Sequence, residues 1–253
     1  MILHAFNLQG KIALVTGCDK GLGQGMALGL AEAGCDIVSV SRSIPQETAE
    51  KVAALGRRMF AIQADLSQPD AIADIVPAAV AAAGRIDILV NNAGTIRRED
   101  ALTFSEKNWD DVMNLNLKSV FFLSQAVAKQ FLQQGNGGKI INIASMLSFQ
   151  GGIRVPSYTA SKSGVLGITR LLANEWAQHG INVNAIAPGY MATNNTQQLR
   201  DDAERSKEIL DRIPAGRWGT PEDLKGPVVF LASSASDYIN GYTVAVDGGW
   251  LAR

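Results

Sequence analysis

Histidine and cysteine are scarce in this sequence, with two of each among 253 residues. His4 and His179 belong to no metal-ligand spacing such as HExxH, so the sequence predicts neither a bound metal nor a histidine-based nucleophile. Cys18 and Cys35 form no CxxC pair, which favours two idle thiols in a reducing compartment over a disulfide framework. Any chemistry must therefore depend on other side chains.

Charge of one sign and long apolar runs are also missing. The 23 Lys and Arg residues are balanced by 24 Asp and Glu residues, for a net charge of -1, and the clustered cations that nucleic-acid binding needs are not evident. No apolar run approaches the ~20 residues that cross a bilayer. The opening MILHAFNLQGK lacks the regions of a signal peptide. We therefore expect a cytoplasmic protein with no membrane or nucleic-acid partner.

Short runs rich in Val and Ile alternate with longer helix-periodic segments along the whole chain. The predicted strands span residues 11–16, 36–41, 59–64, 86–91, 139–144, 181–187 and 242–246. The predicted helices span residues 22–33, 45–55, 69–83, 106–133 with an interruption near Asn116, 158–179 and 199–212, and a last helix starts at Thr220-Pro221. Such alternation is typical of a parallel sheet covered on both faces. Because no linker divides the chain, we predict one α/β domain over residues 1–253, a doubly wound sheet of seven parallel strands.

A glycine-rich turn, TGCDKGLG at residues 16–23, follows the first predicted strand and opens a helix. Gly17 would permit a tight turn, Gly21 would let the backbone approach a pyrophosphate, and Gly23 would permit close helix packing. The helix N-terminus would offer free N–H groups to that anion. An ordinary strand–helix turn is the alternative, but the place of the motif favours a dinucleotide site in a Rossmann fold.

The residues after the second predicted strand bear on the type of dinucleotide. A site for NAD usually has a carboxylate here to hold the ribose 2′-hydroxyl, whereas this chain has Ser41-Arg42, with Lys20 in the nearby turn. Arg42 could pair with a 2′-phosphate of NADP or stack on the adenine of NAD. The sequence leaves both dinucleotides open.

A serine, a tyrosine and a lysine form the candidate catalytic group. Ser145 follows the fifth predicted strand, and Tyr158 and Lys162 lie four residues apart, on one face of a helix. A phenol has a pKa near 10, and lowering it by ~3 units with a neighbouring ammonium needs about 4 kcal/mol. Tyr158 could then exchange a proton with a substrate, while Ser145 donates a hydrogen bond to the same oxygen. The alternative is an exposed tyrosine and a solvated lysine.

The joint motif set resembles the short-chain dehydrogenase/reductase family over essentially the whole chain. The matching residues are Thr16 to Gly23, Asn91-Asn92-Ala93-Gly94, Asn116, Ser145, Tyr158-x-x-x-Lys162 and Pro188-Gly189. The resemblance implies that Tyr158 is the general acid/base, that Ser145 polarises the substrate, and that Lys162 lowers the tyrosine pKa and binds the nicotinamide ribose. It also implies that Asn116 holds a water in a proton relay, and that the protein is a homotetramer with the helix of Tyr158 and the last strand in its interfaces.

The same resemblance implies which residues contact a nicotinamide dinucleotide. Asp65 would approach the adenine, Asn92 would brace the central strands, and Thr193 would contact the carboxamide. The full implied set is Gly17, Asp19, Lys20, Gly21, Leu22, Gly23, Ser41, Arg42, Asp65, Leu66, Asn92, Ala93, Gly94, Tyr158, Lys162, Pro188, Gly189, Met191 and Thr193.

A finer resemblance concerns the substrate. The segments 96–100, 144–162, 187–200 and 212–218 and the ending AVDGGWLAR are similar to those of family members that act on deoxy keto sugar acids in pectin and hexuronate breakdown. That subgroup favours NAD(H), so we expect NAD(H), with NADP(H) possible because of Lys20 and Arg42. The alternatives are an NADP-linked 3-oxoacyl reductase, another sugar dehydrogenase, or a dinucleotide sensor without catalysis.

A sugar acid carries a carboxylate, so its pocket should offer a cation. The candidates by position are Arg154, which is preferred because it lies between Ser145 and Tyr158, then Arg97, with Arg98 and Arg217 as further choices. Each could instead be a solvated side chain.

Polar side chains could complete the substrate pocket. Gln150 and Asn194 could hydrogen-bond to hydroxyl groups of the substrate. The charged, amide-rich segment 190–218 is predicted to be a mobile lid, with an ordinary exposed excursion as the alternative. Trp218 and Trp250 are expected to be packing or interface residues.

Overall fold

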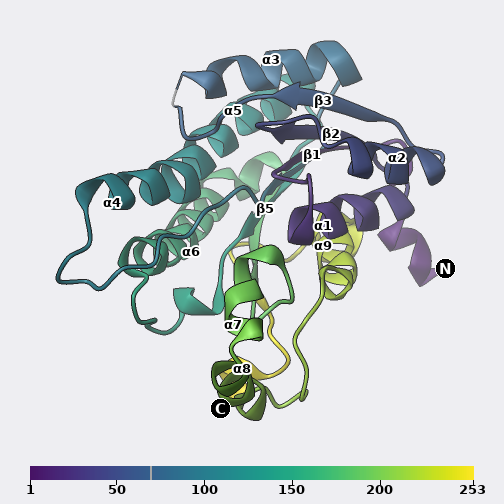
Figure 1. Ribbon diagram of the computed structural model, residues 1–253. Helices are drawn as coiled ribbons and strands as arrows, with labels where there is room; N and C mark the ends of the chain where they lie inside the picture. The colour runs from purple at the N-terminus through teal and green to yellow at the C-terminus, as the bar shows by residue number, and fades with distance from the viewer. Residues whose placement is uncertain (69) are drawn as a thin grey trace.

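The computed structural model describes residues 1–68 and 70–253. They contain a seven-stranded parallel sheet with the order β3-β2-β1-β4-β5-β6-β7 (Figure 1). The strands are β1 (Ile12–Thr16), β2 (Asp36–Ser41), β3 (Met59–Gln63), β4 (Ile88–Asn91), β5 (Gly138–Ile143), β6 (Ile181–Pro188) and β7 (Thr243–Val246). The predicted doubly wound sheet is confirmed.

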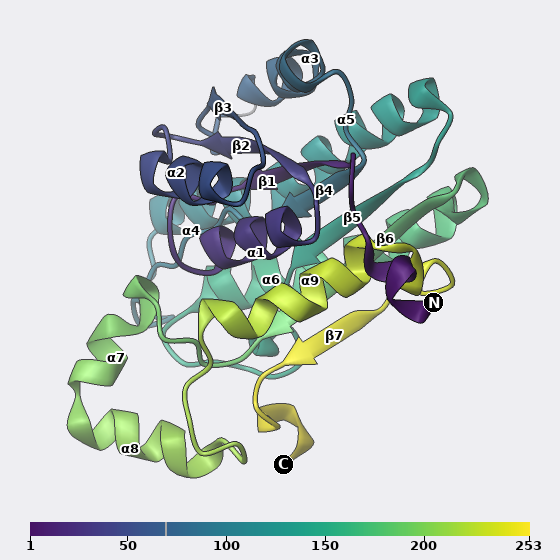
Figure 2. The same ribbon diagram turned by 90° about the vertical axis from the view of Figure 1, so that its right-hand side faces the viewer.

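Helices cover both faces of this sheet (Figure 2). One layer consists of α1 (Gly21–Glu32), α2 (Gln46–Ala54) and α9 (Lys225–Ala232). The other consists of α3 (Ala71–Ala83), α4 (Glu106–Met113), α5 (Ser119–Gln134) and α6 (Pro156–Trp176). Two further helices, α7 (Gln197–Asp201) and α8 (Ala203–Arg212), lie outside these layers (Figure 1).

The two layers enclose separate apolar cores. Leu14 and Val15 are neighbours in β1 and fully buried, yet they belong to different clusters because successive side chains of a strand point to opposite faces. Met26 and Leu30 of α1 share a cluster with Val15, whereas Phe131 of α5 shares one with Leu14. Burial on both faces explains why the central strands are almost wholly apolar.

Most predicted elements are confirmed, with shifted ends. The predicted helix over 106–133 is interrupted at the expected place by a π-helical turn, Asn114–Lys118, between α4 and α5. The predicted helical segment over 199–212 is confirmed but divided into α7 and α8. Asp202 leaves the helical conformation and caps α8 by accepting a hydrogen bond from the Arg205 N–H. The predicted helix over 69–83 is α3, and Pro69 lies outside the described residues.

Thr220 and Pro221 begin a helical segment as predicted. The Thr220 N–H donates to the Asp223 carboxylate at 2.7 Å, which completes a capping box. The segment starts as a 3-10 helix, Pro221–Leu224, that continues directly into α9. Among the described residues, no helix is long and apolar enough to cross a membrane.

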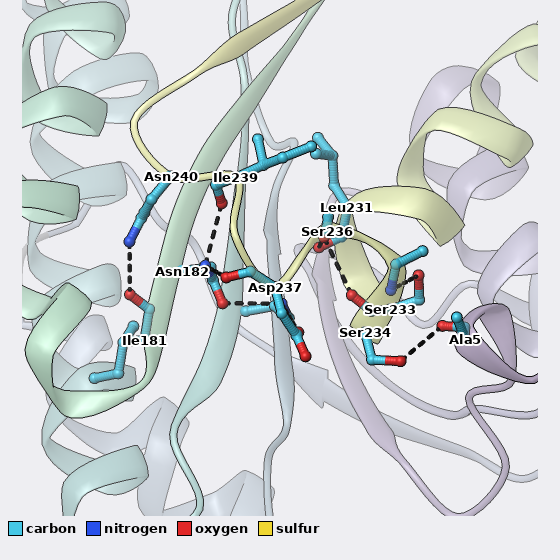
Figure 3. A network of polar contacts seen from close by, with 12 residues as sticks. Ala5, Ile181, Asn182, Leu231, Ser233, Ser234, Ser236, Asp237, Ile239 and Asn240 are labelled. Carbon is cyan, nitrogen blue, oxygen red and sulfur yellow. Dashed lines mark hydrogen bonds and ion pairs between the residues drawn. The ribbon is translucent and has the colours of Figure 1, made fainter.

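Polar contacts hold the loop between α9 and β7 (Figure 3). The Asn182 amide of β6 donates to the main-chain oxygens of Asp237 and Ile239, at 2.9 and 3.1 Å. The Ser234 hydroxyl donates to the Ala5 carbonyl at 3.1 Å. The network therefore anchors the chain just before β7, which pairs with β6 through its whole length.

Candidate active site

A cleft of about 1550 Å³ opens at the carboxyl ends of the strands. Its walls come from the segments that follow β1 through β6, together with α8 and Trp250. Ligands of open parallel sheets bind at this edge, where neighbouring strand–helix connections diverge. The cleft therefore joins the predicted phosphate turn and the predicted catalytic residues in one site.

The glycine-rich turn after β1 has the geometry that its sequence predicts. Gly17 and Gly21 have φ angles of 65° and 59°, which favour glycine. A Cβ at Gly23 would lie 2.1 Å from the Gly17 carbonyl oxygen, so a larger residue is excluded there. The Asn92 amide donates to the main-chain oxygens of Thr16 and Gly17, each at 2.9 Å. The turn is thereby fixed to the residue after β4. The first residues of α1 line the cleft, where the N-terminus of a helix can bind an anion.

The end of β2 carries no carboxylate. Ser41, Arg42 and Lys20 all line the cleft, and the Ser41 hydroxyl is buried without a hydrogen-bond partner. Asp65 lies at the same end, but its carboxylate already accepts bonds from the N–H and hydroxyl of Ser67. These two bonds, with a smaller effect of the Arg42 charge, hold its pKa below the usual range. The two cations could pair with a phosphate, whereas the Ser41 hydroxyl is buried away from any ligand.

Ser145, Tyr158 and Lys162 come together in the cleft. Ser145 lies two residues beyond the end of β5. The other two lie on consecutive turns of α6, which begins at Pro156 rather than at the predicted Tyr158. The Lys162 ammonium donates to the Ile143 carbonyl at the end of β5 and lies 5.8 Å from the centre of the Tyr158 ring. One helix face and one strand end therefore position all three groups.

The pKa values of this group differ from the sequence-based prediction. Burial raises the pKa of Tyr158, and only partial compensation comes from the Ser145 hydrogen bond and the Arg98 charge, which lower it. Burial also lowers the pKa of Lys162 to about 8. The sequence predicts that Lys162 lowers the pKa of the phenol well below 10. In the protein alone the pKa is raised instead, because burial of the hydroxyl outweighs the groups that lower it.

Asn116 lies behind the cleft wall rather than in it. It sits in the π-helical turn, is fully buried, and does not line the cleft. Its side chain accepts from the Thr95 N–H at 2.8 Å and donates to the Thr95 carbonyl at 2.9 Å. The structure thus shows Asn116 holding the segment after β4 in place. Its predicted role in a water relay stays a prediction.

The predicted dinucleotide residues all line the cleft. They are Gly17, Asp19, Lys20, Gly21, Leu22, Gly23, Ser41, Arg42, Asp65, Leu66, Asn92, Ala93, Gly94, Tyr158, Lys162, Pro188, Gly189, Met191 and Thr193. Whether each contacts a dinucleotide stays a prediction, but their common location is what that prediction requires.

The predicted substrate residues are divided. Arg97, Arg154, Gln150 and Asn194 line the cleft beside Ser145. Arg217 does not, and its predicted contact with the substrate stays a prediction. Its guanidinium forms a two-pronged ion pair with Asp223, at 2.7 and 2.8 Å, which the sequence could not reveal because the partner lies in the next helical segment.

Two cleft residues of α8 were not predicted. Arg205 and Arg212 both line the cleft, and the Arg212 guanidinium lies 4.1 Å from the centre of a Trp250 ring. Their spacing, with the buried Ile209 between them, places all three on one helix face. This helical spacing could have predicted from the sequence that the three residues share a face, although the charge of the segment suggested exposure to solvent.

Trp218 and Trp250 pack as expected. Both contact the ring of Tyr190 edge to face, at 5.5 and 4.8 Å between ring centres. Trp250 is buried in an apolar cluster with Ile209 and Ile213 of the α8 region. These rings therefore join the C-terminal segment to the base of the predicted lid.

Among the described residues, no group of three His, Cys, Asp or Glu side chains is placed to hold a metal ion.

Residues 17–251 match the family model adh_short_C2, described as "Enoyl-(Acyl carrier protein) reductase". The chain belongs to the short-chain dehydrogenase/reductase family. It is thus an oxidoreductase of a family that uses a nicotinamide cofactor.

Similar members of the short-chain dehydrogenase/reductase family match over the full chain. The 2-dehydro-3-deoxy-D-gluconate 5-dehydrogenases of Dickeya dadantii and Escherichia coli are 78% and 77% identical, each covering 100% of both chains. A crystal structure from Agrobacterium tumefaciens, described as a 2-deoxy-D-gluconate 3-dehydrogenase with bound NADP, is 56% identical with a TM-score of 0.93, covering 98% of this chain and 99% of that one.

Proposed function

We propose that this protein interconverts 2-dehydro-3-deoxy-D-gluconate and 3-deoxy-D-glycero-2,5-hexodiulosonate in the breakdown of pectin and hexuronates. The observation that carries the proposal is the meeting of Ser145, Tyr158 and Lys162 in a cleft whose other end is the glycine-rich turn. The full-length similarity to two enzymes named for the first of these compounds supports the choice of substrate.

The roles of the three side chains follow from their positions. The Ser145 hydroxyl lines the same cleft as the phenol, whose pKa it lowers, and can donate to the reacting substrate oxygen. Tyr158 gives a proton to that oxygen during reduction and takes it back during oxidation. Lys162, anchored on the Ile143 carbonyl, keeps a positive charge near the phenol below a pH of about 8. A bound nicotinamide ring would supply or accept the hydride.

The dinucleotide preference follows from the end of β2. With Ser41, Arg42 and Lys20 there and no carboxylate at the strand end, the protein is proposed to use NADP(H) as well as NAD(H). The bound NADP of the Agrobacterium tumefaciens relative supports this choice over the preference for NAD(H) expected from the sequence.

The substrate end of the cleft disfavours the alternatives. A 3-oxoacyl reductase needs an apolar path for an acyl chain, whereas Arg97, Arg154 and Arg212 line this end. A sensor without catalysis needs no paired phenol and ammonium in its cleft. A polar, cationic pocket suits a sugar acid.

Steady-state assays of the purified protein test the proposal. The 2,5-diketo acid should be reduced with oxidation of both NADPH and NADH, and 3-oxoacyl thioesters should react poorly. The variant Arg42→Ala, by removing a phosphate partner, should lower kcat/KM for NADPH about tenfold or more and leave the value for NADH nearly unchanged. Turnover of the thioesters but not of the sugar acid would contradict the substrate assignment.

Assembly and lid motion are part of the same proposal. Exposed apolar side chains on α5 and α6, including Phe122 and Leu171 at 43% and 47% exposure, support a homotetramer built through these helices. Light scattering of the protein as it elutes from a size-exclusion column measures the mass of the assembly.

The segment 190–218 is proposed to close over bound substrate. The protein is proposed to be cytoplasmic, since the buried free thiols Cys18 and Cys35 suit a reducing compartment.

A further inference from the structure

Arginine side chains from three separate segments surround the substrate end of the cleft. They differ in whether another residue already neutralises them. The Arg205 guanidinium lies 2.7 Å from a Glu208 oxygen, and the Arg154 Nε atom lies 3.5 Å from the Asp100 carboxylate. A carboxylate ligand gains most from a cation that has no such partner, because a paired guanidinium must first give up existing bonds.

Arg97 and Arg98 are adjacent and show this difference most clearly. The Arg97 guanidinium donates to the Thr95 hydroxyl at 2.9 Å and to the Asp111 carboxylate at 3.1 Å. Its charge is thereby compensated, and a ligand would have to compete with these bonds for its donors. The second choice of the sequence-based ranking is therefore a structural ion pair.

Arg98 has no such compensation. Within residues 1–68 and 70–253, no carboxylate lies within 4 Å of its guanidinium, and its side chain lines the cleft. Its Nη2 atom donates to the main-chain oxygen of Asn195 at 3.1 Å. Since a guanidinium has five N–H donors, a planar edge stays available for a two-pronged carboxylate contact.

Arg98 also lies near the reacting group. Its charge acts on the Tyr158 phenol, lowering the pKa of that group. At the substrate end of the cleft, the other described arginine without an acidic partner is Arg212, which is held by stacking on Trp250 and by a bond to Gln150 at 3.4 Å. Position and free donors thus distinguish Arg98 from the other cations of the cleft.

We propose that Arg98 binds the substrate carboxylate, holding it against the Asn194–Thr196 turn while the far end of the sugar acid meets Tyr158. The proposal rests on the proposed function, because it assigns the acid group of that substrate. It replaces Arg154 and Arg97 as the preferred carboxylate partner. Bonding to Asn195 fixes the guanidinium plane, which reduces the entropy lost when a carboxylate binds.

Two compounds and two neighbouring variants test this assignment. The compounds are the 2,5-diketo acid and its amide, in which a neutral carboxamide replaces the carboxylate. For Arg98→Gln, kcat/KM should fall about 30-fold for the acid, mainly through KM, and less than about threefold for the amide. Arg98→Lys should recover part of the loss, since it restores the charge without the planar fork.

Arg97→Gln is the matched comparison. It should leave the ratio of acid to amide activity unchanged, whatever it does to stability. Arg58→Gln, outside both the cleft and the segment 190–218, should leave both activities unchanged. Equal losses for acid and amide in Arg98→Gln, no loss for either, or a fall in the ratio only in Arg97→Gln would each overturn the proposal.

A failure of the proposed function gives a different result. In that case the wild type reduces neither compound. Calorimetric binding of the acid and the amide to the wild type and to Arg98→Gln then decides: acid binding that weakens with the substitution supports the role of Arg98, and acid binding that is absent or unchanged overturns it.

Discussion

The two ends of the cleft are built differently. The dinucleotide end is built largely from glycines and main-chain groups of the turn after β1, as at Gly17 and Gly23, together with the side chains of Lys20, Ser41 and Arg42. The substrate end consists of long charged side chains on loops and on α8, such as Arg98 and Arg212. Main-chain geometry tolerates few substitutions, whereas side chains on connecting segments can vary without disturbing the sheet. The difference indicates how one scaffold can keep its cofactor and change its substrate.

The largest expected effect comes from the junction of the two ends. Tyr158→Phe removes the proton-transferring oxygen and should lower kcat by about 10³-fold, within the usual range for general acid–base groups. Dinucleotide binding should persist, because the glycine-rich turn is untouched. Rapid-mixing kinetics and fluorescence titration with NADPH measure the two quantities. Retained turnover would remove Tyr158 from the mechanism.

Gly23→Ala tests the rigidity of the dinucleotide end. The added Cβ would meet the Gly17 oxygen at 2.1 Å, so either α1 or the turn must move. We expect a loss of about 3 kcal/mol in the free energy of unfolding and weakened NADPH binding. Chemical denaturation and titration measure both.

Gly226→Ala is the matched control for that variant. A Cβ at Gly226, inside α9, has nothing within 4 Å, so alanine should be neutral or stabilise by up to about 1 kcal/mol. Equal destabilisation by the two substitutions would show that close packing is not the reason why position 23 requires glycine.

Arg154→Gly tests whether the substrate end stores strain. Arg154 has a φ of 62°, the left-handed region, and is the one non-glycine residue with positive φ in the described part of the chain. Glycine adopts this conformation freely, so the variant should be more stable by about 1 kcal/mol in thermal unfolding. Destabilisation instead would show that the ion pair with Asp100 outweighs the backbone cost.

A further expected effect concerns pH. Burial lowers the pKa of Lys162 to about 8, below its value in an unfolded chain. Between about pH 8 and pH 10 the unfolded state therefore binds more protons at this site, so its contribution to stability rises with pH, by at most about 1.4 kcal/mol per pH unit. Unfolding of Lys162→Met and the wild type across this range isolates the effect. A wild-type curve parallel to that of the variant would contradict it.

The sequence predicted the fold, and the meeting of the glycine-rich turn with Tyr158 and Lys162 in one cleft, for a physical reason. Apolar strands, glycines before a helix and the four-residue spacing of Tyr158 and Lys162 are local patterns with one main structural solution. Side-chain pairing is not local. Arg217 lies against Asp223 and Arg97 against Asp111 because of the tertiary fold, which no spacing rule contains.

The pKa of Tyr158 was mispredicted for a related reason. Sequence spacing shows that an ammonium is near the phenol, but it does not show how much water the fold removes from the hydroxyl. The helical break at Asp202 is similar, since the residue fits both a helix interior and a cap. Residues that are close in space determine both the pKa of Tyr158 and the position of the helical break.

The π-helical turn at Asn114–Lys118 restricts where residues can be inserted or deleted during evolution. This turn holds one more residue than ordinary winding, so α4 and α5 are out of phase with each other. Deleting a single residue there would restore regular winding and rotate one helix by about 100° relative to the other. Asn116 would then swing away from Thr95. Insertions and deletions should be excluded from this stretch even where substitutions are harmless.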